Sequence, residues 1–301
     1  MKESKYSIFH VQGGIGKHIA ATAVAKAITN NYPDRKLIVV CAYPEIFINL
    51  GFVDRVYQIG ATQYFYQEYV QNKDSILFHN EPYYTTNHIH ARKKLIENWC
   101  DMYGITYSGE KPHLKFNRLQ YNLSKDFWSR EKPLMILHTN GGLMTKDAKP
   151  YSWTRDMPVE IGQEIVNHYK KDYHIFQLTK LNSPKLKDTE HVFATQGQTL
   201  SLMEYFSIIL HSEKRVLIDS CVQHACAALD KKSTVLWNGT SPNVFGYDLH
   251  DNIKTDVPYD FKLPGSYLFD FDFNGNEVEY PFADDVQPFD IDKIIESVDN
   301  Q

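Results

Sequence analysis

The chain has 301 residues, which exceeds the ~100–200 residues of a typical domain and indicates either two domains or one large α/β domain. Hydrophobic residues make up 43% and charged residues 23%, a composition typical of globular proteins that excludes collagen-like, low-complexity and mostly disordered classes. The formal charge of −5, from 32 Lys and Arg against 37 Asp and Glu, provides no overall basic field, so we expect no stable nucleic-acid partner.

The cysteines and the N-terminus favour a reducing compartment. Cys41, Cys100, Cys221 and Cys226 form no CxxC pair, which argues against a disulfide framework and against a thiolate zinc site. The first residues contain no signal-peptide core, and no apolar run approaches the ~18 residues that cross a bilayer. We therefore expect a cytoplasmic protein without a transmembrane segment.

The first half of the chain alternates apolar runs with stretches of helical spacing. Residues 6–11 predict a strand, residues 12–17 a glycine-rich turn, and residues 19–28 a helix. Further apolar runs predict strands at residues 37–41, 54–57 and 75–79 and a helix over 89–103. This alternation predicts a mostly parallel sheet with helices on both sides.

A stretch of polar and charged residues between positions 117 and 133 separates this half from the next. We place a domain boundary there, with one domain over residues 1–128 and another over 129–301. The second half predicts strands at residues 134–138, 174–178, 215–218 and 233–237, and helices over 159–171, after the capping box of Ser201 and Glu204, and through 225–229. We expect an α/β fold of two Rossmann-like domains that face a cleft.

The C-terminal residues follow a different pattern. Residues 267–280 alternate with period two around Asn274-Gly275, which predicts a hairpin. Residues 291–298 predict a short closing helix.

The glycine-rich turn reads Gln12-Gly13-Gly14-Ile15-Gly16-Lys17-His18. It follows a strand and opens a helix, a place where backbone N–H groups can cradle a phosphate, so Gly13, Gly14 and Gly16 are candidate binding residues. The turn resembles the variant P-loop of partitioning ATPases, which keeps a P-loop ATPase or kinase as an alternative. Gln12 replaces the signature lysine of that family, and His18 replaces the Ser or Thr that holds Mg²⁺. The turn also fits a purely structural role in close helix–sheet packing.

A second motif begins at the end of strand 215–218. It reads Asp219-Ser220-Cys221-Val222-Gln223-His224-Ala225, and the next strand is followed by Gly239-Thr240-Ser241-Pro242. The run is similar to the Asp-Ser-Gly-x-x-His-x-Ala-Ala-Ala stretch and Gly-x-Thr-x-Pro loop of the ADP-heptose lipopolysaccharide heptosyltransferase family. Residues 138–142 and 153–158 match further family segments in the right order. The resemblance covers residues 130–245 well and implies the two-domain GT-B fold.

The resemblance implies a transferase that moves a sugar from a nucleotide-sugar donor to a hydroxyl of a lipopolysaccharide or other glycan, with inversion. It assigns the donor to the second domain, where the candidates are Thr139, Asn140, Lys149, Asp219, Ser220, Cys221 and His224. A helix N-terminus with hydrogen-bond donors can stabilise a leaving diphosphate. We therefore expect no metal and no cofactor. An isolated His224 would also fit an ordinary helix histidine.

The chain departs from the family at the catalytic aspartate, because Lys17 occupies the position after Gly16. An inverting transferase needs a general base for the acceptor hydroxyl. Glu81, just past a predicted strand of the acceptor-side domain, is our first candidate, and His18 is the second. Lys17 would bind charge instead. Glu81 could equally be a solvated loop carboxylate.

Other functions stay open at this point. The missing aspartate fits a non-catalytic sugar-nucleotide-binding protein, and a modified nucleic-acid base is a possible acceptor. We discount a metal site at His79, His88 and His90, because no thiolate is near and residues two apart point to opposite sides of a strand.

Overall fold

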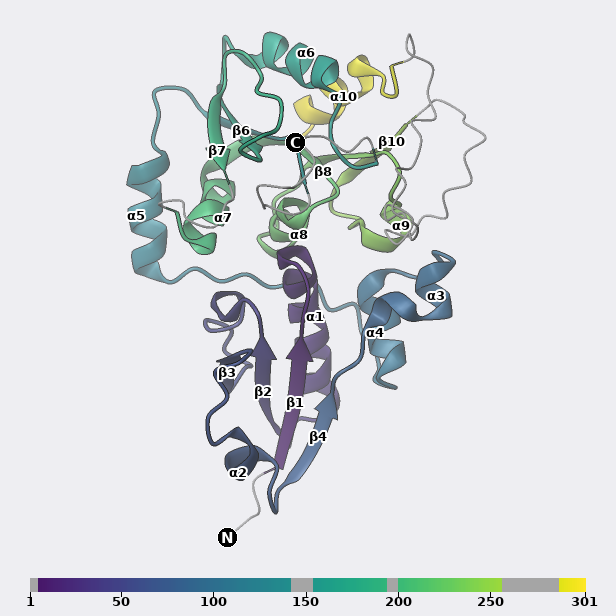
Figure 1. Ribbon diagram of the computed structural model, residues 1–301. Helices are drawn as coiled ribbons and strands as arrows, with labels where there is room; N and C mark the ends of the chain where they lie inside the picture. Colours follow the sequence, from purple (N-terminus) through teal and green to yellow (C-terminus); the bar gives the residue numbers. More distant parts are fainter. Residues whose placement is uncertain (1–4, 142–153, 194–199, 256–286) are drawn as a thin grey trace.

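The computed structural model describes residues 5–141, 154–193, 200–255 and 287–301, which form two parallel β-sheets flanked by helices (Figure 1). The first sheet has the strand order β3-β2-β1-β4, and the second has the order β10-β9-β8-β5-β6-β7. Every strand pair is parallel. The predicted α/β class and parallel pairing are therefore confirmed.

The first sheet is built from the apolar runs of the N-terminal part. Its strands are β1 (Lys5–Val11), β2 (Lys36–Cys41), β3 (Arg55–Gln58) and β4 (Asp74–Phe78). The helices around it are α1 (Ile15–Asn31), α2 (Phe65–Tyr69), α3 (Thr86–Ile89) and α4 (Leu95–Met102), with short 3₁₀ turns at Pro44–Ile46 and Pro82–Tyr84. The helix expected over residues 89–103 is shorter, because it begins only at Leu95.

The second sheet is formed by the part of the chain that begins at Leu134. Its strands are β5 (Leu134–His138), β6 (His174–Thr179), β7 (Glu190–Phe193), β8 (Ser212–Ile218), β9 (Thr234–Trp237) and β10 (Asp251–Lys254). Its helices are α6 (Val159–Tyr169), α7 (Leu202–His211), α8 (Cys221–Ala228), α9 (Pro242–Phe245) and α10 (Ile291–Asp299). The capping box of Ser201 and Glu204 and the closing helix are confirmed. The expected hairpin lies outside the described residues.

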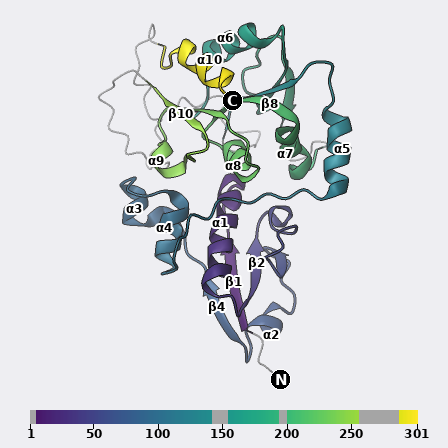
Figure 2. The same cartoon turned by 180° about the vertical axis from the view of Figure 1, so that it is seen from behind.

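The polar segment before the second sheet contains a helix that we did not predict from the sequence. This helix, α5 (Arg118–Trp128), begins at a capping box formed by Asn117 and Gln120. It lies along α7 in both views (Figures 1 and 2), and the indole Nε1 of Trp128 donates to Ser207 Oγ at 2.8 Å. The expected boundary between residues 128 and 129 falls between the two sheets and remains a prediction about domains.

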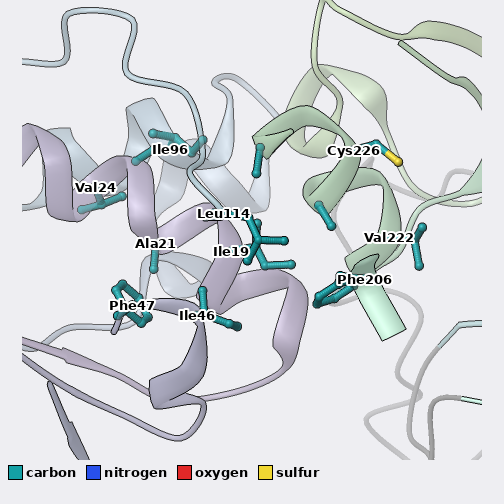
Figure 3. Packing of buried hydrophobic residues seen from close by; sticks show 14 of the residues in the cluster. Ile19, Ala21, Val24, Ile46, Phe47, Ile96, Leu114, Phe206, Val222 and Cys226 are labelled. Carbon is teal, nitrogen blue, oxygen red and sulfur yellow. The ribbon is translucent and has the colours of Figure 1, made fainter. Parts of the chain in front are cut away.

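The two sheets are joined by direct packing of α1 against α8. Small and branched side chains of α1, among them Ile19, belong to the same buried cluster as Phe206 of α7 and Val222 of α8 (Figure 3). The alanines of α1 are fully buried, which lets its backbone approach its neighbours closely. The apolar core therefore continues from one sheet to the other and fixes the N-terminal ends of α1 and α8 next to each other.

Candidate functional site

The N-terminal turns of two helices meet at Gly16 of α1. A Cβ atom added at Gly16 would lie 2.9 Å from Cδ2 of His224 and 3.3 Å from Cα of Cys221, so a side chain has no room there. Helix N-termini carry unpaired N–H groups and a partial positive charge. Gly14 is the N-cap residue of α1, and no side-chain hydrogen bond caps the N–H groups at this helix end. The convergence of two such ends creates a place suited to an anion.

Ser220 and His138 link the start of α8 to the end of β5. Ser220 is the N-cap residue of α8, where its Oγ accepts a hydrogen bond from the Val222 N–H at 3.3 Å. The same oxygen lies 2.7 Å from Nδ1 of His138. Burial lowers the pKa of His138 to about 3, so this imidazole is neutral at physiological pH. His138 was missed as a site residue, although it directly precedes the predicted Thr139.

His224 lies in the first turn of α8 and is 6% exposed. Its Nδ1 lies 2.7 Å from the hydroxyl oxygen of Tyr247. Burial lowers the pKa of His224 to about 3. The imidazole of His224 is therefore neutral at physiological pH, with one N–H group and no positive charge. Tyr247 was also missed, because nothing in the sequence indicated that its loop returns to α8.

Thr139 and Asn140 form a buried network in the loop after β5. Asn140 Oδ1 accepts from the hydroxyls of Thr139 at 2.8 Å and Thr179 at 2.9 Å. Asn140 Nδ2 donates to Asp156 at 3.1 Å, and the backbone N–H of Gly141 donates to the same carboxylate at 2.9 Å. Both predicted side chains therefore hold this loop in place, and their contact with the donor remains a prediction.

Lys17 and Glu81 form an ion pair beside the start of α1. The Lys17 side chain is 5% exposed and that of Glu81 is 34% exposed. The ammonium also lies 5.0 Å from the ring centre of Tyr83 and 5.3 Å from that of Trp99. Burial lowers the pKa of Lys17, and Glu81 partly offsets this effect. The structure thus brings together Lys17 and our first candidate base, Glu81.

His18 is occupied within the fold, which corrects its assignment as a candidate base. Its Nδ1 lies 2.9 Å from the carbonyl oxygen of Gly14, and its Nε2 accepts from the Ala42 N–H at 3.1 Å. Burial lowers its pKa to about 4. Both ring nitrogens are engaged, so His18 can neither accept a substrate proton nor hold Mg²⁺. His18 therefore does not take over the role of the Ser or Thr that holds Mg²⁺ in a P-loop.

The remaining predicted residues divide into three groups. Gly13 has φ +96°, a conformation that favours glycine, and it packs against the Lys17 side chain. Asp219 is buried directly after β8. Burial raises the pKa of the Cys221 thiol to about 12, so this thiol is not a nucleophile at neutral pH. Lys149 lies outside the described residues.

The histidines near β4 form no shared site. His79 packs edge-on against His10 with ring centres 4.3 Å apart, whereas His88 packs against Tyr83 and Phe245. Within the described ranges, no group of three or more His, Cys, Asp or Glu side chains is arranged to hold a metal ion. Across the same ranges, no helix is both long and apolar enough to span a bilayer.

Comparison with solved structures supports the predicted fold. A glycosyl transferase of family 9 from Veillonella parvula has a TM-score of 0.64 at 11% identity, over 84% of this chain and 86% of the other. The E. coli ADP-heptose lps heptosyltransferase II has a TM-score of 0.59 at 11% identity, over 89% and 94%. No family model and no curated protein sequence matches the chain. At these identities the resemblance expected from the motifs is confirmed as a shared fold.

A third neighbour corrects one expectation. TibC, an iron-containing dodecameric glycosyltransferase from enterotoxigenic E. coli, has a TM-score of 0.68 at 10% identity, over 100% of this chain and 77% of TibC. Our prediction of no metal and no cofactor was based on a helix N-terminus that stabilises the leaving diphosphate in place of a metal. This neighbour of the same fold contains iron, which contradicts the prediction of no metal and no cofactor.

Proposed function

We propose that the protein is a glycosyltransferase that uses a nucleotide-sugar donor. The observation that carries this proposal is the meeting of the α1 and α8 N-termini at Gly16, Cys221 and His224. A diphosphate needs several N–H donors in one place, and converging helix ends supply them without moving. The shared fold with glycosyltransferases supports the same conclusion.

We assign the donor diphosphate to the first turn of α8. Ser220 orients this turn through its cap to Val222 and its contact with His138. His224 offers an N–H group on the side that faces α1. As the bond between the anomeric carbon and the phosphate oxygen breaks, negative charge grows on the diphosphate, and fixed donors stabilise this charge. ADP-sugars are the first donors to test, because structures with this fold include a complex with ADP-D-beta-D-heptose.

Glu81 is the proposed general base on the acceptor side. Its carboxylate would take the proton of the acceptor hydroxyl while that oxygen attacks the anomeric carbon and the nucleoside diphosphate leaves from the opposite face, which inverts the configuration. Lys17 holds the carboxylate in place through the ion pair. A glycan hydroxyl, as in a lipopolysaccharide, is the proposed acceptor.

A sugar-nucleotide-binding protein without transfer activity is the second candidate. The observation that favours it is the ion pair itself, because Lys17 occupies the carboxylate that a transferase would need as its base. Both candidates predict donor binding, whereas only a transferase releases nucleoside diphosphate in the presence of an acceptor.

A stability screen followed by a product assay tests the proposal. The melting temperature is measured with ADP-, UDP-, GDP- and CMP-sugars, and a ligand at ~100 times its Kd stabilises a protein by about 2.7 kcal/mol. The stabilising donor is then incubated with bacterial glycan acceptors, and release of nucleoside diphosphate is measured for wild type and Glu81→Gln. We expect release by wild type and strong loss in the variant with donor binding retained. Stabilisation by none of the donors contradicts the proposal, and binding without release supports the second candidate.

A further inference from the structure

Tyr247 holds the ring of His224 from the loop after α9. The hydroxyl oxygen lies 2.7 Å from Nδ1 of His224, and the two rings are edge-to-face with centres 5.5 Å apart. Tyr247 also packs against His250, whose Nε2 lies 3.1 Å from the carbonyl oxygen of Gln223. The position of the tyrosine is therefore fixed by the same loop that covers α8.

The donor of this hydrogen bond is either the Tyr247 hydroxyl or Nδ1 of His224, and the surroundings favour the hydroxyl. Among the described residues, no second acceptor is recorded for the Tyr247 hydroxyl, so a hydroxyl that did not donate to Nδ1 would leave a buried O–H unpaired. An unpaired buried donor costs free energy. Burial keeps both groups neutral, because it raises the pKa of Tyr247 and lowers that of His224. The arrangement with Tyr247 as donor to Nδ1 satisfies both groups.

The neighbouring glutamine does not compete for this role. The side-chain nitrogen of Gln223 lies 3.4 Å from both ring nitrogens of His224, so it bonds neither of them selectively. It donates instead to the carbonyl oxygen of Phe245 at 3.1 Å. Tyr247 is therefore the partner that distinguishes Nδ1 from Nε2.

The ring edge opposite Nδ1 faces α1. Cδ2 of His224, which is bonded to Nε2, is the atom nearest to a Cβ added at Gly16. We propose that Tyr247 is a positioning residue that holds His224 as the Nε2–H tautomer and aims this N–H at a phosphate oxygen at the first turn of α8, beside the close contact with Gly16. The inference rests on the proposed donor site. The opposite tautomer would present a lone pair to the phosphate and repel it.

The tautomer can be measured without any ligand. The full chain is labelled with ¹⁵N-histidine, and the His224 signals are identified by their loss in His224→Gln. Long-range ¹H–¹⁵N correlations at pH 7 should show a protonated Nε2 and an unprotonated Nδ1. A protonated Nδ1 in the wild-type protein overturns the inference, whether or not the protein transfers sugar.

Binding tests the consequence for the ligand. The Kd values of ADP, UDP and GDP are measured for wild type, Tyr247→Phe and the control Tyr57→Phe, whose hydroxyl contacts Tyr69 instead. For the diphosphate that binds, we expect about a tenfold higher Kd in Tyr247→Phe, equivalent to ~1.4 kcal/mol, and no change in the control. Unchanged binding by a folded Tyr247→Phe overturns the positioning role. Binding by none of the three diphosphates contradicts the proposed function, while the tautomer measurement still decides this inference.

Discussion

Single side chains at the junction of α1 and α8 have roles that their chemistry alone does not reveal. His18 and His224 are both buried and neutral, yet His18 bonds the protein at both nitrogens and His224 keeps one edge toward α1. Lys17 stands where the resemblance led us to expect an acid, and its partner in the structure is the Glu81 carboxylate. At this scale, function depends on which partner each group has.

Glu81→Gln should destabilise the protein because it leaves the Lys17 ammonium buried without its carboxylate. We expect a loss of about 2 kcal/mol in the free energy of unfolding, less than for a fully buried pair since Glu81 is partly exposed. Adding Lys17→Met to Glu81→Gln should restore more than half of this loss, as an apolar side chain suits the contacts with Tyr83 and Trp99. Urea unfolding of wild type, both single variants and the double variant measures the coupling. Additive effects of the two substitutions would contradict the ion pair.

At the scale of elements, helix α1 depends on small residues to reach α8. Gly16 and Gly14 form a matched pair, because a Cβ atom at Gly16 would meet His224 and Cys221 whereas one at Gly14 would meet nothing within 4 Å. The approach of the two helices therefore depends on one glycine and not on the glycine-rich turn as a whole.

Gly16→Ala should force α1 and α8 apart. Overpacking of this kind costs about 1–3 kcal/mol, so we expect a lower unfolding free energy together with weaker nucleoside-diphosphate binding. Gly14→Ala, the control for packing, should change stability by less than about 1 kcal/mol. Denaturant unfolding and titration of both variants measure these effects. Equal behaviour of the two variants would show that the close contact at Gly16 does not matter.

The elements could be predicted from sequence to different degrees. Continuous apolar runs such as Leu134–His138 indicated the central strands, since strands buried on both faces need no alternation. Helix α5 was missed although Leu119, Leu123 and Phe127 recur every four residues, because the segment was judged by its polar and charged residues. The short edge strands β7 and β10 were missed because four residues carry little periodicity.

The site could be predicted only in part for a related reason. The motif around Asp219 and His224 is local in sequence and could be recognised from its neighbours. The partners that decide its chemistry come from elsewhere: His138 is 82 residues from Ser220, and Glu81 is 64 residues from Lys17. Spacing along the chain contains no information on such contacts until the sheet order is known.

At the scale of the whole molecule, buried neutral histidines occur in the elements around both sheets and at the junction of α1 and α8. His18, His88 and His250 have pKa values lowered to about 4, and His138 and His224 to about 3, with burial as the largest cause in each case. None of these imidazoles can take up a proton without disturbing the core. Their common effect is a dependence of global stability on pH.

Stability should fall as the pH drops below about 6.5, the ordinary histidine value. Between that pH and about 4, the unfolded chain binds protons that the folded protein does not bind, so acid favours unfolding. Each histidine contributes at most about 1.4 kcal/mol per pH unit in this range. Melting temperatures measured from pH 8 to pH 4.5 should be constant above neutrality and decline steeply below it. A constant melting temperature down to pH 4.5 would contradict neutral burial of these side chains.

The most direct test of the account is a calorimetric titration of the protein with ADP, UDP and GDP and with the corresponding nucleosides. We predict that at least one diphosphate binds, that its nucleoside binds far more weakly, and that His224→Ala raises the Kd about tenfold or more, since a hydrogen bond to a charged group contributes about 1.5–3 kcal/mol. If no diphosphate binds, or if one binds equally well to His224→Ala, the junction of α1 and α8 is not a donor site.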